Sequence, residues 1–138
     1  GAGTLCIVDV DMHRAEALAA NVSGLYAGKA VAASSAEAAL HGATGLIHAT
    51  PTGMAKMPGL PLPSSLLRAD LWVSEAVYFP METELLKAAR GRGCPVVDGG
   101  TMAVGQAVIA FELFTGRKAD ASRIEAHFRS LASLSCRT

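Results

Sequence analysis

The sequence has no excess of charge and few aromatic residues. Its 12 basic and 12 acidic side chains cancel, and aromatic residues make up 5% of the 138 positions. No basic run occurs, nor any alternation of basic with aromatic residues. Nothing therefore supports nucleic acid or an anionic membrane as a partner, and we expect neither.

Long apolar runs are also missing. No stretch reaches the roughly 18 residues of a membrane-spanning helix, and the N-terminus lacks the basic start of a secretory signal. These absences predict a soluble, cytoplasmic protein. Because residue 1 is glycine and not methionine, the interpretation that the chain is incomplete stays open.

Cysteine and histidine are too scattered to indicate a disulfide framework or a metal site. Cys6, Cys94 and Cys136 are odd in number and form no C-x-x-C pair. The histidines show no H-x-x-x-H spacing on one helix face. We expect no metal, and we expect Cys6 and Cys94, which lie in apolar runs, to be buried thiols in a reducing compartment.

What the sequence does contain is an alternation of strand-like and helix-like segments, with 51% hydrophobic residues to build a core. Short apolar runs predict strands at 5–9, 29–33, 45–49, 71–78 and 95–98. Helical spacing predicts helices at 13–21, 35–41, 82–90, 102–115 and 120–133. Two of these helices should direct a core face inward, formed by Ala15, Leu18 and Ala19 and by Leu85, Leu86 and Ala89. The alternation predicts an α/β domain with a doubly wound parallel sheet, covered by helices on both faces.

The first residues, Gly1 to Gly3, do not fit a phosphate-binding loop. Such a loop follows a strand and opens a helix, whereas these glycines precede the strand at 5–9. Asp9 ends that strand, where the second strand of a Rossmann domain carries the acidic residue that binds the adenosine ribose. We assign Asp11 to the helix N-cap and Asp9 to the ribose, with a structural role for Asp9 left open. The glycine loop is then expected before residue 1.

Residues 51–63 form an irregular segment that is rich in proline and glycine. Long loops inside compact domains are usually functional, and this loop follows a strand directly. In open α/β sheets, ligands bind at the carboxyl ends of strands. The segment is therefore a candidate binding loop.

Four motifs, in this order, resemble the shikimate dehydrogenase family. They are H-A-T-P-T-G-M at 48–54, V-S-E-A-V-Y-F-P-M-E-T-E-L-L at 73–86, D-G-G-T-M-A-V-G-Q-A at 98–107 and F-E-L-F-T-G at 111–116. The resemblance covers essentially the whole chain, but only the C-terminal, cofactor-binding half of such enzymes. It implies a partial Rossmann-like domain over 1–138 with C-terminal helices. The first strand-loop-helix unit and the N-terminal substrate domain have no counterpart here.

The resemblance implies a dehydrogenase that transfers hydride between a nicotinamide cofactor and shikimate or quinate. Together with the Asp9 assignment, it places along the cofactor the residues Asp9, Arg14, Thr50, Pro51, Met54, Ala76, Val77, Gly100, Met102 and Ala103. It places Tyr78 and Gln106 toward the substrate. From the residues alone, Thr50 could equally cap the loop, Met102 could be core and Gln106 could be a surface amide.

The implied catalytic Lys and Asp belong to the half without a counterpart. Lys56 and Lys87 are better explained as solvated surface charges. We therefore expect no dehydrogenase activity from these 138 residues alone.

The turn after the first strand bears on cofactor choice. NADP-dependent members of the family carry an N-R-T-like turn whose Arg pairs with the 2′-phosphate, whereas this chain has Asp9-Val10-Asp11. That pattern resembles the NAD-preferring quinate/shikimate dehydrogenases. NAD is the expected cofactor, and NADP stays open as the less favoured one because Arg14 is near.

The chain departs from the family pattern at three positions. His48 replaces the usual Asn, Glu75 the usual Asp, and Gly105 a bulkier residue. Altered substrate fit and decayed function are both left open as explanations.

Two alternatives to the leading interpretation stay open. The chain could be an inactive truncated module for nucleotide binding or dimerisation, and a homodimer is compatible with either interpretation. A glutamyl-tRNA reductase would share the R-A-E-A-L-A helix, but the motif at 98–107 argues against it. The sequence does not rank quinate against shikimate.

An absent first strand has a structural consequence. In the Rossmann strand order 3-2-1-4-5-6, that strand lies between the strands expected here at 5–9 and 45–49. Both would then present unpaired backbone groups, a known route to aggregation. We expect the isolated chain to be poorly soluble or molten.

Overall fold

The computed structural model describes residues 2–26 and 28–135. Gly1 and Cys136, which the sequence interpretation mentioned, lie outside this part of the chain. The chain divides into two compact units, residues 1–43 and 44–138.

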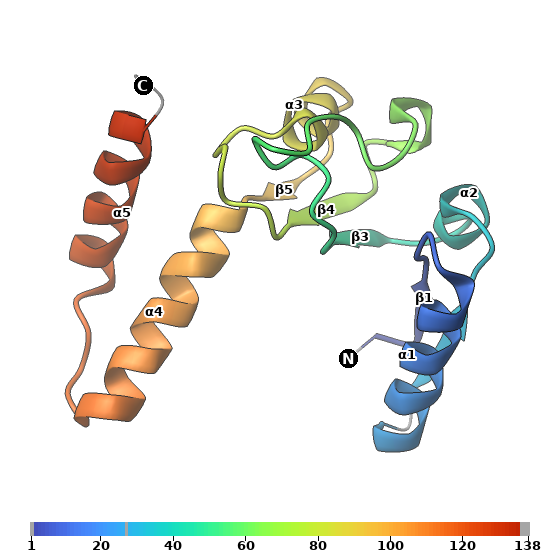
Figure 1. Ribbon diagram of the computed structural model, residues 1–138, viewed down its shortest axis with the longest axis horizontal. Coiled ribbons are helices and arrows are strands. Elements are labelled where there is room, and N and C mark those ends of the chain that lie inside the picture. The colour runs from blue at the N-terminus through green and yellow to red at the C-terminus, as the bar shows by residue number, and fades with distance from the viewer. Residues whose placement is uncertain (1, 27, 136–138) are drawn as a thin grey trace. The chain divides into compact units, whose positions relative to one another are not determined.

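The first unit is a two-stranded parallel sheet with two helices. β1 (Thr4–Ile7) pairs with β2 (Lys29–Ala32). α1 (Met12–Leu25) connects the strands and packs against both, and α2 (Ala36–Leu40) follows β2 (Figure 1). The predicted N-cap is confirmed, because the Asp11 carboxylate accepts a hydrogen bond from the His13 amide at 3.0 Å.

Two predictions about burial in this unit are wrong. Ala15 and Ala19 are buried, but Leu18 is 51% exposed, and Cys6 is exposed as well. A two-stranded sheet covers only a narrow stripe of α1, and residues four apart on a helix fill such a stripe. No residue of β1 is fully buried, so an apolar residue such as Cys6 stays accessible.

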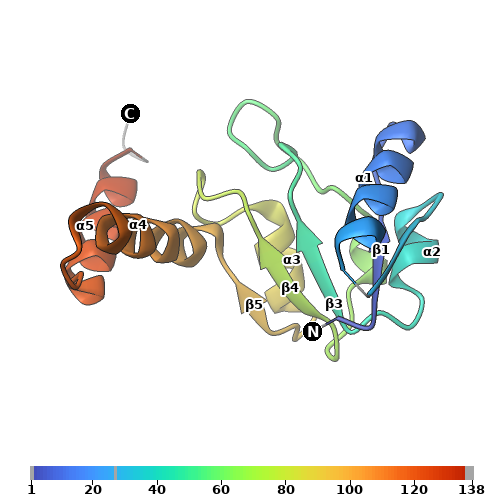
Figure 2. The same cartoon turned by 90° about the horizontal axis from the view of Figure 1, so that it is seen from below.

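The second unit contains a three-stranded parallel sheet. Its order is β3 (Gly45–His48), β4 (Trp72–Glu75) and β5 (Val96–Val97), and α3 (Glu84–Gly91) packs against β4 and β5 (Figure 2). A single 3-10 turn, η1 (Ser64–Leu66), interrupts the long connection between β3 and β4. The predicted core face of α3 is confirmed, with Leu85, Leu86 and Ala89 all buried.

The strand order agrees with a Rossmann-like α/β fold. Neighbours β2 and β1 correspond to the third and second strands of the usual order, and β3, β4 and β5 correspond to the fourth, fifth and sixth. Among the described residues, β1–β2 and β3–β5 form two separate hydrogen-bonded sheets. The α/β class is confirmed, and the described strands form two sheets where a complete domain of this class has one.

Two helices complete the second unit. α4 (Gly99–Thr115) and α5 (Ala121–Ser135) pack against each other. α4 begins three residues before the prediction because Asp98 caps it, accepting from the Thr101 amide at 2.7 Å. It ends as predicted at Gly116, whose φ of 65° is left-handed.

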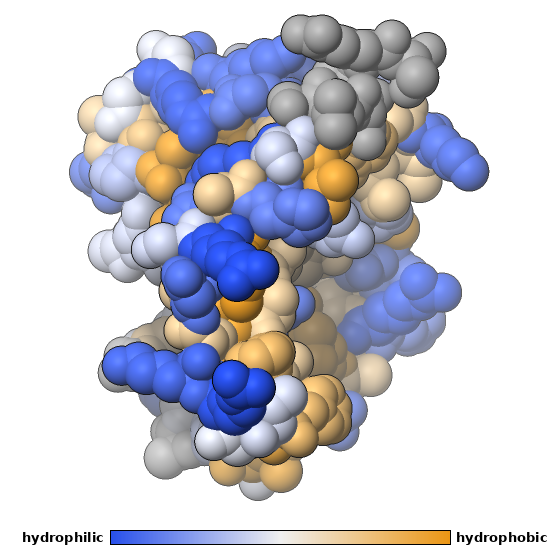
Figure 3. Space-filling view, turned by 90° about the vertical axis from the view of Figure 1, so that its left-hand side faces the viewer, coloured by the Kyte–Doolittle hydropathy of each residue, from blue (hydrophilic) through white to orange (hydrophobic). Residues whose placement is uncertain are grey.

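The C-terminal helices expose apolar side chains. Ile109, Leu113, Phe114 and Leu131 are all exposed. Figure 3 shows the side on which α5 lies, where apolar surface reaches solvent between hydrophilic side chains. None of the helices in the described ranges is long and apolar enough to cross a membrane.

Candidate functional site

The carboxyl ends of β3, β4 and β5 lie at one edge of the second sheet, because all three strands run parallel. Eight of the predicted site residues follow these ends. Thr50 and Pro51 follow β3, Ala76, Val77 and Tyr78 follow β4, and Gly100, Met102 and Ala103 follow β5. Thr50 and Pro51 are exposed and Tyr78 is 53% exposed. A ligand at this edge could therefore reach their side chains.

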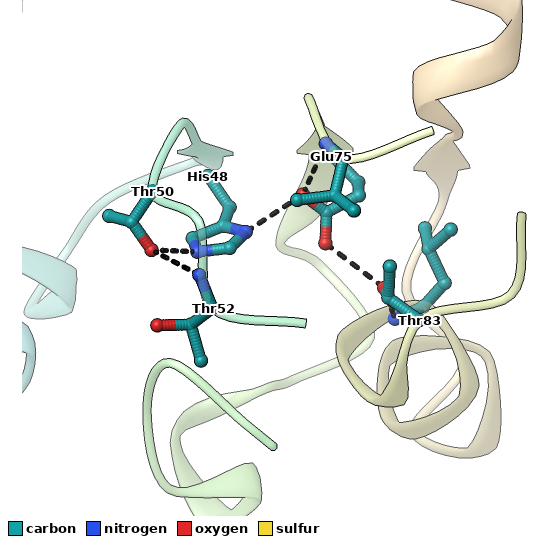
Figure 4. Close-up of polar contacts among 7 residues, drawn as sticks. His48, Thr50, Thr52, Glu75 and Thr83 are labelled. Atoms are coloured by element: carbon teal, nitrogen blue, oxygen red, sulfur yellow. Dashed lines mark hydrogen bonds and ion pairs between the residues drawn. The ribbon is translucent and has the colours of Figure 1, made fainter. Parts of the chain in front are cut away.

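A buried hydrogen-bonded pair, His48 and Glu75, underlies this edge. His48 and Glu75 are the last residues of β3 and β4 and are register partners. The His48 Nδ1 atom lies 2.8 Å from the Glu75 Oε1 atom (Figure 4). The two side chains are 4% and 0% exposed.

The Glu75 carboxylate holds two further segments. Its Oε1 atom accepts a hydrogen bond from the Val77 amide at 3.0 Å, and its Oε2 atom accepts one from the Thr83 hydroxyl at 3.0 Å. The Thr83 oxygen in turn accepts from the Leu86 amide at 3.2 Å, which makes Thr83 the N-cap of α3. One carboxylate thus ties the end of β3, the turn after β4 and the start of α3.

These contacts decide the charge of Glu75. Burial alone would raise the pKa of its carboxyl. Hydrogen bonds from His48, the Val77 amide and Thr83 outweigh burial and hold the pKa below its ordinary value of 4.5. Glu75 is therefore ionised at neutral pH. Its stabilising contribution is lost only when the pH falls through that lowered pKa.

The other ring nitrogen of His48 reaches the accessible edge. Its Nε2 atom lies 2.6 Å from the Thr50 hydroxyl oxygen, which also accepts a long hydrogen bond of 3.4 Å from the Thr52 amide. Figure 4 shows this chain of contacts from Glu75 through His48 to Thr50. The buried pair therefore touches an exposed residue that the sequence resemblance placed along the cofactor.

The start of α4 lies close to the turn after β4. A Cβ atom on Gly99 would lie 2.4 Å from the Val77 carbonyl oxygen, and one on Gly100 would lie 2.5 Å from the Met81 Cε atom. The Tyr78 ring meets the Phe128 ring of α5 edge-on, with centroids 6.3 Å apart. Glycine at the start of α4 permits this close approach of helix and turn.

In the first unit, Asp9 and Arg14 lie on the turn and helix after β1. The exposed Asp9 accepts a hydrogen bond from the Asp11 amide at 2.9 Å through its Oδ1 atom. The Arg14 Nε atom lies 3.5 Å from the Asp11 Oδ2 atom. Asp11 therefore engages the nearby cation, and Asp9 keeps a carboxylate oxygen that can accept from a ligand.

The remaining predicted residues lie on exposed surface. Met54 lies in the loop after β3, and Gln106 lies one turn after Met102 on the same side of α4. Lys56 and Lys87 are exposed, as predicted for surface charges.

Sequence reasoning missed Thr83 and the contact between His48 and Glu75. Both His48 and Glu75 are polar residues at strand ends, and that pattern was the available signal. Only the register of β3 against β4 makes them partners.

Three comparisons with known proteins bear on the site. A family model described as the C-terminal domain of shikimate 5'-dehydrogenase matches residues 99–127. A shikimate dehydrogenase (NADP(+)) of Streptomyces avermitilis is 52% identical over 135 residues, which cover 96% of this chain and 46% of that protein. A quinate/shikimate dehydrogenase (NAD(+)) of Corynebacterium glutamicum is 46% identical over 134 residues, covering 95% of this chain and 47% of that protein.

A solved structure agrees with these relatives. Quinate dehydrogenase from Corynebacterium glutamicum in complex with NAD is 46% identical, with a TM-score of 0.84, over 94% of this chain and 47% of that one. The predicted resemblance is confirmed, and the chain spans about half the length of the curated relatives it matches.

Proposed function

We propose that this chain, which matches the C-terminal half of shikimate and quinate/shikimate dehydrogenases over nearly its whole length, is the cofactor-binding part of such an enzyme. The proposed reaction is hydride transfer between a nicotinamide cofactor and shikimate or quinate. The observation that carries the proposal is the similarity to the NAD complex, with a TM-score of 0.84 over 94% of the chain.

The available side chains suit a dinucleotide. Asp9 is an exposed carboxylate two residues after the end of β1, and a carboxylate accepts hydrogen bonds from both hydroxyls of an unmodified ribose. The same charge repels a 2′-phosphate, while Arg14 is engaged by Asp11. The similar dehydrogenases include one named for NADP and one named for NAD. We therefore propose NAD from the local chemistry of Asp9.

The sheet edge of the second unit is proposed to hold the nicotinamide part of the cofactor. Thr50, Pro51 and Met54 would line it from the loop after β3, and Ala76 and Val77 from the turn after β4. Gly100 would allow close approach, with Met102 and Ala103 packing on the ring. When bound, the nicotinamide ring supplies or accepts the hydride.

Tyr78 and Gln106 are proposed to hydrogen-bond the hydroxy-acid substrate. Both are exposed polar side chains, Tyr78 in the turn after β4 and Gln106 on α4. The proton that leaves or joins the substrate hydroxyl needs an acid-base group within hydrogen-bond reach. We assign that role to the Lys and Asp expected in the other half of such enzymes.

The first test is a dehydrogenase assay on the complete polypeptide encoded by the gene that contains these residues. NADH formation should depend on shikimate or quinate, with NAD used more efficiently than NADP. The 138-residue polypeptide alone serves as the comparison and should show no turnover.

Two results would contradict the proposal. The complete polypeptide could form no reduced cofactor with either acid and bind no NADH, which would remove the function. Turnover by the 138 residues alone would instead show that the acid-base groups lie in this chain.

A further inference from the structure

Two of the positions that depart from the family pattern contact each other. His48 stands where the family usually has Asn and Glu75 where it usually has Asp, and their side chains meet at 2.8 Å. Glu75 is 0% exposed and His48 4% exposed. Neither side chain can therefore make a substantial direct contact with a substrate, and any effect on the reaction must pass through a neighbour.

The polar side-chain atoms of His48 and Glu75 all have hydrogen-bond partners. Glu75 accepts from His48, from the Val77 amide and from Thr83. No buried side-chain nitrogen or oxygen in residues 2–26 and 28–131 lacks a hydrogen-bond partner. A decayed site would be expected to leave unpaired buried polar atoms, each costing about 1–3 kcal/mol. Complete pairing indicates that His48 and Glu75 form an intact hydrogen-bonded cluster.

The neighbours of the pair lead to the exposed edge. His48 meets the Thr50 hydroxyl at 2.6 Å, and Glu75 holds the backbone one residue before Tyr78. A carboxylate only accepts hydrogen bonds, so the His48 Nδ1 atom carries a proton. The Nε2 atom of this tautomer then accepts a hydrogen bond from the Thr50 hydroxyl. The Thr50 oxygen is left to accept from a ligand donor such as a ribose hydroxyl or a carboxamide N–H.

We propose that His48 and Glu75 form a matched pair of positioning residues that orients the Thr50 hydroxyl and the Val77 backbone toward the cofactor. The inference rests on the proposed function, because it takes Thr50 and Val77 as cofactor neighbours. It adds that the two departures act as one unit and retain cofactor binding.

The test is a double-mutant cycle in the complete polypeptide, with H48N, E75D and H48N/E75D. NADH binding is followed by its fluorescence, and thermal unfolding is recorded for each variant. Each single change breaks a charge-assisted hydrogen bond and should raise the Kd for NADH about tenfold. Because the two residues act as one unit, the double change should raise the Kd no further than either single change does.

T83A is the matched control for stability. This variant loses the hydrogen bond to the Glu75 Oε2 atom and the cap of α3. The Glu75 Oε1 atom keeps its contacts with His48 and the Val77 amide. T83A should lower the unfolding temperature while changing the Kd for NADH by no more than about twofold.

T50V provides a second test if H48N or E75D does not fold, since Thr50 is exposed. It should weaken NADH binding, and H48N should add little to it.

Distinct results overturn the inference. Effects of H48N and E75D on the Kd that simply add in the double variant would show that the residues are not matched. A T50V protein with unchanged NADH affinity, or a T83A protein that loses affinity as H48N does, would show a purely structural cluster. Absence of NADH binding in the unaltered protein would instead overturn the proposed function, and the positioning role with it.

Discussion

At the scale of single residues, the carboxylates of Glu75 and Asp9 have different roles. Glu75 is buried and holds three neighbours through charge-assisted hydrogen bonds. Asp9 is exposed and uses its Oδ1 atom to accept from the Asp11 amide. The buried carboxylate therefore organises the protein, whereas the exposed one is available to a ligand.

Changing Asp9 to Asn tests the choice of cofactor. Asn keeps the side-chain oxygen that accepts from the Asp11 amide, but it loses the negative charge. Hydrogen bonds to a charged group contribute about 1.5–3 kcal/mol, so D9N should lower the preference for NAD over NADP at least about tenfold. The measurement is kcat/KM for each cofactor in the complete polypeptide.

The neighbouring carboxylate supplies the control for this prediction. D11N retains a capping side chain and should leave the cofactor preference much less changed. An unaltered preference in D9N would assign Asp9 a structural role, the alternative that the sequence left open.

At the scale of elements, the start of α4 depends on its glycines. Asp98 caps the helix through the Thr101 amide, and Gly99 brings the first turn against the Val77 carbonyl. The contact is backbone to backbone, so no side chain can move aside to relieve it. The close approach of α4 to the turn after β4 therefore requires glycine.

Changing Gly99 to Ala should destabilise this element. The added Cβ would lie 2.4 Å from the Val77 oxygen and 2.6 Å from its carbonyl carbon. Overpacking of this kind costs about 1–3 kcal/mol, and a lower midpoint of chemical unfolding should show it.

Gly105 is the matched control on the same helix. A Cβ there meets nothing within 4 Å, so G105A should raise stability by up to about 1 kcal/mol through helix propensity. Equal effects of G99A and G105A would contradict this account. The exposed position of Gly105 gives its departure from the family pattern no packing role among the described residues.

At the scale of the whole molecule, the described sheets are short and have several edges. The first sheet has two strands and the second has three. Small open sheets with unpaired edges need a covering element or another chain. Exposed apolar residues on α4 and α5 add to this requirement.

The 138-residue polypeptide made by itself should therefore associate. We expect sedimentation to show concentration-dependent oligomers and thermal unfolding to be broad. I47K places a charge on the edge strand β3, at a side chain that is 63% exposed, and should reduce association without lowering helix content. A monomer with a sharp unfolding transition would show that the unpaired strand edges do not cause association.

Local patterns were enough to locate the elements. Apolar runs placed the five strands of the described ranges, although β4 ends at Glu75 and not at Tyr78 as predicted. Helical spacing and capping residues placed α1 to α5, and Asp11 and Gly116 act as predicted because caps depend on adjacent residues. The four motifs indicated the family for the same reason, since each lies within a short stretch of chain.

By itself, then, the sequence determined the α/β class, the order of the elements and the family that the chain resembles. Only the tertiary structure decided that His48 faces Glu75, because that contact depends on the register of two strands far apart in the chain. It also decided that Leu18 and Cys6 are exposed, since burial depends on how wide a sheet each element packs against. In the sequence, the departures at His48 and Glu75 are 27 residues apart and look unrelated. In the structure they form one buried pair.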